Sequence, residues 1–154
     1  MKTISKNILL ILFLFVNFVS LQAKVILPSF FSDNMVFQQK SNVPFWGTAA
    51  VGTSVKVTSS WDNKAYTAKA DATGRWSVTL KTPVFGGPYT ITVNDGDTRT
   101  LKNILIGEVW LCSGQSNMEM PLDGWGKINN YEQEIRNADY PQIRLLQATH
   151  TTST

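Results

Sequence analysis

Apolar and polar positions from residue 25 to about residue 101 follow the two-residue period of short β-strands. Residues 54–58, 75–80 and 89–93 alternate clearly, so that each of these segments has one apolar face. Glycine, proline, asparagine and aspartate separate the runs, as in the Asp-Ala-Thr-Gly turn at 71–74. Several short strands at spacings of roughly 8–12 residues predict an antiparallel, sandwich-like domain.

Further along the chain the pattern changes to a near-continuous apolar run over 104–112, with Glu108 as the single charged interruption. Such runs are typical of parallel strands that are buried on both faces. We expect Glu108 to have a hydrogen-bonding partner or to lie at an exposed strand end, because a lone buried carboxylate is costly. A short helix is predicted over 129–137 and a second strand over 142–147. This order of elements predicts the start of an α/β domain, with the boundary near residues 102–106.

The N-terminal segment has the layout of a secretory signal peptide. Lys2 and Lys6 precede an apolar run over 8–19, and Ala23 provides a small residue for cleavage. The run is about a dozen residues long, whereas a helix that spans a bilayer needs about 20. We expect cleavage after Ala23 and a secreted or periplasmic protein without membrane attachment; a retained N-terminal anchor is the alternative. The predicted organisation is a signal peptide at 1–23, a β domain at 24–103 and the incomplete start of an α/β domain at 104–154.

Charge and composition exclude several classes of partner. The chain has 14 basic and 11 acidic residues, and loss of the two signal-peptide lysines lowers the formal charge from +3 to +1 (12 basic against 11 acidic). No basic cluster with interleaved aromatic residues remains, so no nucleic acid is expected as a partner. One cysteine and one histidine cannot form a structural zinc site. Cys112 lies within an apolar run and is expected to be a buried small hydrophobe rather than a reactive thiol.

A candidate nucleophile lies just after the predicted strand. Ser116 is the central residue of the Gly-Gln-Ser-Asn-Met segment at 114–118. Reactive groups in open α/β sheets gather outside the carboxyl ends of the strands, where backbone N–H groups can also stabilise an oxyanion. Met118 replaces the second glycine of the Gly-x-Ser-x-Gly nucleophile elbow, so this pattern leaves a simple polar loop equally open.

The run Gly-Glu-Val-Trp-Leu-Cys-Ser-Gly-Gln-Ser-Asn-Met-Glu at 107–119 resembles the first sequence block of sialate O-acetylesterases. These enzymes are a carbohydrate-esterase branch of the SGNH hydrolase superfamily. Upstream segments that resemble the β-rich N-terminal region of the family lie at 31–38, 43–47, 74–80 and 87–89. The resemblance therefore covers nearly the whole chain after residue 23. It implies a mixed fold, in which a sandwich-like domain precedes a flavodoxin-like (SGNH hydrolase) domain.

The resemblance implies that Ser116 is the nucleophile of a Ser-His-Asp type of acyl transfer. Ser116 would attack an acetyl ester on a sugar hydroxyl, and an acetyl-enzyme would then be hydrolysed without a metal or an organic cofactor. The Ser116 backbone N–H would donate to the oxyanion, and the expected pocket residues are Gln115, Asn117 and Trp125. The substrate would be an acetylated sugar or glycan; the oligomeric state stays open.

The family's catalytic Asp and His, in an Asp-x-x-His arrangement, belong to blocks well downstream of the first one. His150, the one histidine here, has no aspartate three residues before it, and we expect it to be a loop residue. Loss of one triad member costs about 10⁴- to 10⁶-fold in turnover. This chain by itself is therefore expected to be inactive.

The alternative function is that of a non-catalytic carbohydrate-binding or accessory β-sandwich module. Exposed aromatic side chains would then stack on sugars, and Trp46, Trp61 and Trp76 are the candidates in the β region. We expect Trp46 and Trp76 in the core because they follow strand patterns, and Trp61 at an exposed turn.

Overall fold

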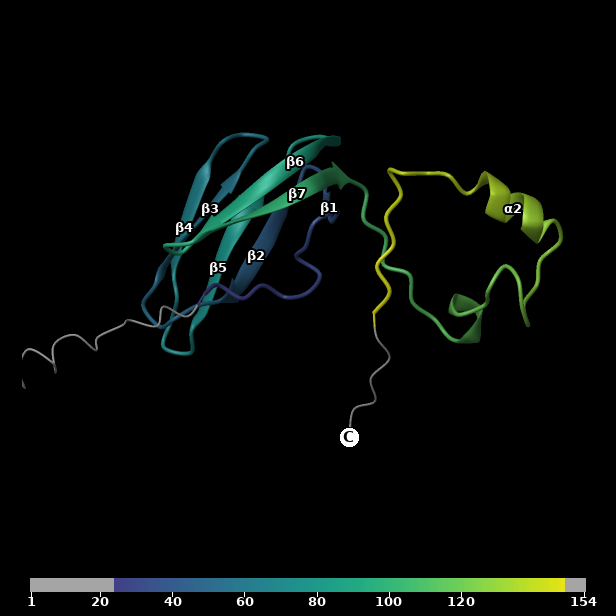
Figure 1. Cartoon of the computed structure of the whole chain (residues 1–154), viewed down its shortest axis with the longest axis horizontal. Helices are drawn as coiled ribbons and strands as arrows, with labels where there is room; N and C mark the ends of the chain where they lie inside the picture. Colours follow the sequence, from purple (N-terminus) through teal and green to yellow (C-terminus); the bar gives the residue numbers. More distant parts are fainter. Residues whose placement is uncertain (1–23, 149–154) are drawn as a thin grey trace, which may run out of the picture.

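The computed structural model describes residues 24–148, and the regular structure of this part is mostly β-strand with few helices (Figure 1). The strands are β1 (Val36–Gln38), β2 (Asn42–Thr48), β3 (Ser54–Ser59), β4 (Ala65–Lys69), β5 (Arg75–Lys81), β6 (Gly86–Asn94) and β7 (Thr98–Gly107). A 3-10 turn, η1 (Ser116–Met118), and one α-helix, α2 (Tyr131–Asn137), follow. No helix within 24–148 is long and apolar enough to span a membrane. The predicted strand-rich fold is confirmed, whereas its finer description as a sandwich followed by an α/β domain stays a prediction.

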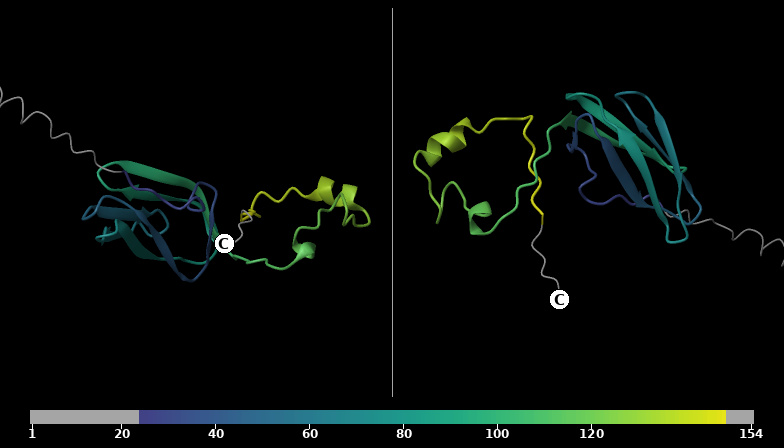
Figure 2. Two further views of the ribbon diagram at one scale, coloured as in Figure 1. Left: turned by 90° about the horizontal axis from the view of Figure 1, so that it is seen from below. Right: turned by 180° about the vertical axis from the view of Figure 1, so that it is seen from behind.

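The seven strands form two sheets. One sheet has five strands in the order β1-β7-β6-β3-β4, and the other pairs β2 with β5. All pairs are antiparallel except β1, which runs parallel to β7. Figure 2 shows the two sheets next to each other in both further views. Buried side chains from both sheets belong to one apolar cluster, so the two sheets share a core.

Strand alternation accounts for this core as the sequence predicted. In β5, Trp76, Val78 and Leu80 are buried while their neighbours are exposed. In β3, Val55 and Val57 are fully buried. Each fully buried side chain of this size contributes about 1.5–3 kcal/mol relative to an exposed one, which explains why the alternating faces meet.

The predicted turn between β4 and β5 is built by one aspartate and one glycine. The Asp71 carboxylate accepts hydrogen bonds from the Thr73 hydroxyl (2.7 Å), the Thr73 N–H (2.7 Å) and the Arg75 N–H (3.0 Å). These bonds, the one from the Thr73 hydroxyl foremost, lower the pKa of Asp71. Gly74 has a φ of 78°, and a Cβ at this residue would lie 2.7 Å from the Ala49 carbonyl oxygen. The turn therefore requires glycine at this position.

The apolar run at 104–112 does not form one strand. Strand β7 ends at Gly107, and Ile104 and Ile106 are buried in the β core. Beyond it, Trp110 and Leu111 are 83% and 95% exposed, and Cys112 is exposed as well. The predictions of a strand to residue 112 and of a buried Cys112 are wrong, because no second layer packs against this segment within residues 24–148.

The second predicted strand, 142–147, is also absent, whereas the predicted helix at 129–137 is confirmed as α2. An extended segment needs a neighbouring strand to pair with, and no strand within the described residues pairs with residues 142–147. A helix satisfies its backbone locally, so α2 forms without such a neighbour.

Two of the three tryptophans considered for sugar binding differ in exposure from the prediction. Trp76 is in the core, as expected. Trp46 is 39% exposed, because its neighbour Phe45 faces the core and successive strand residues point to opposite faces. Trp61 is half-buried rather than exposed: it packs against Phe37, and its indole N–H donates to the Lys81 carbonyl at 3.0 Å.

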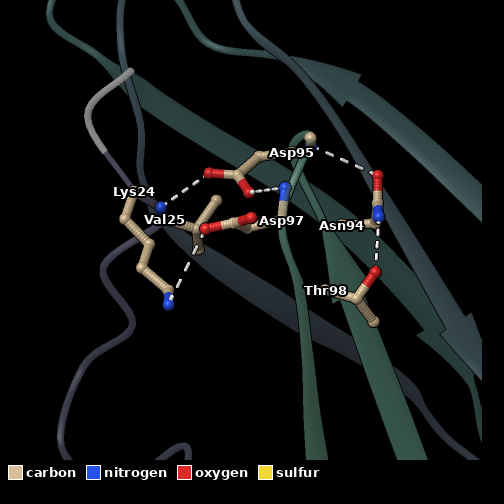
Figure 3. A network of polar contacts seen from close by, with 7 residues as sticks. Lys24, Val25, Asn94, Asp95, Asp97 and Thr98 are labelled. Atoms are coloured by element: carbon tan, nitrogen blue, oxygen red, sulfur yellow. Dashed lines mark hydrogen bonds and ion pairs between the residues drawn. The ribbon is translucent and has the colours of Figure 1, made fainter. Parts of the chain in front are cut away.

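The turn between β6 and β7 fixes the first described residues to the β region (Figure 3). The Val25 N–H donates to the Asp95 carboxylate at 2.7 Å, and the Lys24 ammonium lies 3.9 Å from the Asp97 carboxylate. Next along the chain, Ile26 exchanges two backbone hydrogen bonds with Thr48, both 2.9 Å long. The segment at 24–28 is thereby laid along the edge of β2.

Candidate active site around Ser116

Ser116 is the first residue of η1 and is exposed. The turn is closed by hydrogen bonds from the Met118 N–H to the Gln115 carbonyl (2.9 Å) and from the Glu119 N–H to the Ser116 carbonyl (3.0 Å). Within residues 24–148, the Ser116 hydroxyl and the N–H groups of Ser116 and Asn117 have no hydrogen-bonding partner. The structure therefore presents a hydroxyl and two backbone donors together on one exposed turn, where the donors are free to bind an oxyanion.

The pocket residues predicted from the sequence are only partly brought together. Gln115, Ser116 and Asn117 are all exposed on the η1 turn, and Trp125 is 68% exposed in the loop that follows. No hydrogen bond or ring contact joins Trp125 to the turn in the described part of the chain. The turn does not follow directly on a strand either, because β7 ends nine residues before Ser116 (116 − 107).

The loop after Ser116 folds back on itself through close contacts at glycines. Met118 lies against Gly114, where a Cβ would be 2.7 Å from the Met118 Cγ. Met120 lies against Gly126 more closely still, and a Cβ there would overlap its side chain. These contacts place Trp125 in the same local loop as the nucleophile candidate.

No histidine lies among residues 24–148, so the structure shows no base for the Ser116 hydroxyl. His150, expected to be a loop residue, lies outside the described residues. The nearby Asp123 forms an exposed ion pair with Lys127 at 3.6 Å. Its carboxylate is therefore engaged within the loop after the turn.

Glu108 has hydrogen-bonding partners and is also exposed, so the structure confirms both of the expectations stated for it. Its carboxylate accepts hydrogen bonds from the amide groups of Gln38 (2.8 Å) and Gln39 (2.7 Å). These bonds, that from Gln38 foremost, lower the pKa of Glu108. Gln38 also accepts from the Val109 N–H at 2.9 Å, and Gln39 accepts from the Phe85 N–H at 3.0 Å. The two glutamines thus fix the direction in which the chain leaves β7.

Arg144 brings the end of the described chain back to the β region, a role that the sequence analysis missed. Its guanidinium donates to the carbonyls of Met35 (3.3 Å) and Asn103 and to the Asn103 side-chain oxygen (3.0 Å). The sequence signal that could have indicated this role is the position of the charged Arg144 among the apolar residues Ile143, Leu145 and Leu146. Figure 1 shows the result: the chain leaves β7, passes through η1 and α2, and returns beside the point of exit.

Comparison with known proteins connects this arrangement to one family. No family model matches the chain. It is 30% identical over 134 residues to the sialate O-acetylesterase of Pongo abelii, and 30% identical over 129 residues to that of Homo sapiens. These matches cover 80% and 77% of this chain but 25% and 24% of the relatives, so the chain spans about a quarter of their length.

A solved structure agrees with these relatives. The crystal structure of a carbohydrate acetylesterase from Xanthomonas citri matches with a TM-score of 0.60 and 40% sequence identity. The match covers 64% of this chain and 23% of that one. Over the part that it spans, the chain belongs to the sialate O-acetylesterase family.

Proposed function

We propose that this protein acts as a carbohydrate O-acetylesterase in which Ser116 is the nucleophile. The observation that carries the proposal is the exposed Ser116 hydroxyl beside two unpaired backbone N–H groups, in a chain related to sialate O-acetylesterases. A secreted or periplasmic location, after cleavage at Ala23, suits an enzyme that acts on glycans outside the cytoplasm. The substrate class is an acetylated sugar or glycan.

The proposed reaction is a two-step acyl transfer. The Ser116 oxygen attacks the acetyl carbonyl carbon while its proton passes to a general base, and the N–H groups of Ser116 and Asn117 stabilise the oxyanion. The sugar hydroxyl leaves with a proton, and water then hydrolyses the acetyl-enzyme to acetate and free Ser116. Gln115 and Trp125 are the side chains proposed to border the acetylated sugar.

The base is the part of this mechanism that residues 24–148 do not supply, since they contain no histidine. A serine without its base keeps little of the activity of a complete triad. We therefore propose that the chain as given is inactive, and that turnover requires a histidine and a carboxylate from a longer polypeptide.

The test uses a longer polypeptide that contains this chain together with the histidine and the carboxylate that the proposal requires, with acetate release from an acetylated sugar as the measurement. Replacing Ser116 by alanine is expected to abolish turnover, while Ser113→Ala, which removes a neighbouring exposed hydroxyl from the same loop, should leave most of it. A fluorophosphonate probe should label Ser116 in the longer protein and hardly at all in this chain. Retained turnover in the Ser116 variant would rule out the nucleophile assignment.

A second candidate function is carbohydrate binding by the β region itself. The observation that favours it is the partly exposed Trp46, which the core does not require. Trp61 does not contribute, because it is packed against the core.

A further inference from the structure

A second candidate site lies away from Ser116, in an open groove of about 790 Å³ at one end of the β2–β5 sheet. Four chain segments form its walls: residues 26–28, 46–48, 68–69 with 71, and 75–77. None of these residues belongs to the part of the chain that carries Ser116. The hydrogen bond from Val25 to Asp95 in Figure 3 and the Ile26–Thr48 pairing hold the first wall in place.

The groove offers a rigid aromatic surface. Trp46 is 39% exposed, and the rings of Phe30 and Phe31 lie edge-on to it with centroids 5.5 and 4.8 Å away. A tryptophan held in this way loses little further conformational freedom when a ligand packs on it. The apolar C–H face of a pyranose ring is a ligand surface that suits such an indole.

One residue of the groove wall carries a buried donor without a partner. Trp76 lines it, and its indole N–H is the one buried side-chain polar atom without a hydrogen-bonding partner in residues 24–148. Buried donors in folded proteins are nearly always paired with protein or water. This N–H is itself buried, so a ligand on the open surface of the groove does not contact it, and the proposal below does not depend on it.

The charge of the groove is positive. Lys69 and Arg75 line it, and neither forms a salt bridge within the described residues. Asp71 is the one acidic lining residue, and its carboxylate is already engaged by Thr73 and by the Arg75 backbone N–H. The Arg75 charge stabilises that carboxylate only at a distance. Two cationic side chains thus remain available to an anionic group of a ligand.

We propose that this groove binds a saccharide unit that carries a carboxylate, with the ring stacked on Trp46 and the carboxylate paired with Lys69 and Arg75. The aromatic surface selects a sugar ring, and the charge selects an acidic sugar over a neutral one. Such a site would hold the protein on an acidic glycan while the reaction takes place elsewhere. It requires neither Ser116 nor a catalytic base, so it stands or falls independently of the esterase proposal.

The test is isothermal titration calorimetry of the full chain with two acidic probes, trigalacturonate and 3′-sialyllactose. Their neutral counterparts, α-1,4-galactotriose and lactose, are the matched controls. At least one acidic probe is expected to bind about tenfold more tightly than its counterpart, because charge-assisted hydrogen bonds account for a difference of this size. No binding of either acidic probe, or equal binding of the neutral sugars, overturns the proposal.

Variants then locate the site. Lys69→Gln combined with Arg75→Gln is expected to lower the affinity for the acidic probe to that for its neutral counterpart. Trp46→Ala is expected to weaken binding about tenfold. Trp46→Phe, which keeps an aromatic ring beside Phe30 and Phe31, should retain part of the affinity and guards against a folding defect.

The controls Trp110→Ala and Lys102→Gln, exposed and outside the groove, should leave binding unchanged. If they weaken binding as much as the groove variants, the assignment is wrong.

Discussion

The region from Lys24 to Gly107 and the region from Glu108 to Ala148 are both rich in apolar residues, but only the first buries them. Phe45, Leu80 and Ile91 are fully buried in the first region, whereas Leu111 and Leu145 are 95% and 93% exposed in the second. No residue from 108 to 148 is buried. This difference in burial shows that an apolar run becomes a core strand only where another element supplies both hydrogen-bonding partners for its backbone and an apolar layer that packs on its side chains.

Exposed apolar surface of this kind commonly marks a place where another polypeptide layer packs. The α/β domain expected from the sequence would supply such a layer for the second region. Glu108 and Arg144 hold this region to the β region at its two ends. The contrast between the two regions leads to four predictions.

The largest expected effect comes from emptying the core of the first region. Phe45→Ala should lower the free energy of unfolding by about 3–5 kcal/mol, the usual cost of truncating a buried aromatic residue. The matched change in the second region, Leu111→Ala, should alter it by no more than about 0.5 kcal/mol. Denaturant titration of the full chain measures both, and equal losses would show that the second region has a core of its own.

A smaller effect is expected from a turn of the first region. Gly74→Ala should destabilise the fold by about 1–3 kcal/mol, because alanine is strained at a φ of 78° and its Cβ would approach the Ala49 carbonyl oxygen. Gly107→Ala is the control at the junction of the two regions: no atom lies within 4 Å of a Cβ there. Thermal unfolding should separate the two variants clearly, and similar melting temperatures would contradict the turn geometry.

The Asp71 carboxylate should make the stability of the first region depend on pH. Its pKa is lowered in the folded state by hydrogen bonds from Thr73 and Arg75. It therefore stabilises the fold at pH above its unfolded pKa, and this contribution is lost as the pH falls through the folded pKa. Asp71→Asn should be less stable than the unchanged chain at pH 7 and should approach it in acid. A stability difference that does not vary with pH would refute this role.

The smallest effect on global stability is expected where the two regions join. Arg144→Gln removes the hydrogen bonds to Met35 and Asn103 and should speed proteolytic cleavage within 108–148 severalfold, with an unchanged unfolding midpoint. Arg136→Gln, which interrupts an exposed ion pair with Glu132 and a hydrogen bond to the Gln133 side chain, both within α2, is the control. Limited proteolysis followed by mass spectrometry compares them, and equal cleavage rates would mean that Arg144 does not hold the second region.

Local patterns were sufficient to predict the parts of the fold in which neighbouring residues carry the information. The alternation at 54–58 and 75–80, the turn at 71–74 and the helix at 129–137 were predicted because each depends on side chains within a few residues. Trp46 was placed wrongly, since a strand pattern does not specify which face meets the second sheet, and Trp61 was placed wrongly because a turn position does not show whether its side chain packs back onto the core. The prediction that Cys112 is buried was wrong for a related reason: an apolar segment is buried only if another element covers it.

The residues of the candidate site likewise divide into those that a local sequence block could identify and those that only the folded chain could. Ser116, Gln115, Asn117 and Trp125 could be named from one continuous sequence block, and their catalytic roles remain proposals. The partners of Glu108 lie 69 and 70 residues away in the chain, and the nearest partners of Arg144 lie 41 residues away. Contacts over such separations have no local signal, so only the folded chain could show them.

The sequence by itself determined the strand periodicity, the turn chemistry, the family block around Ser116 and the division of the chain into a strand-rich part and a different second part. These properties reside in short stretches whose backbone preferences and side-chain order act locally. The tertiary structure alone decided that β7 ends at Gly107, that Trp46 faces a cationic groove, and that Arg144 returns to Asn103. Each of these features depends on which distant segments come into contact. The burial and the hydrogen bonds that stabilise such contacts exist only in the folded chain.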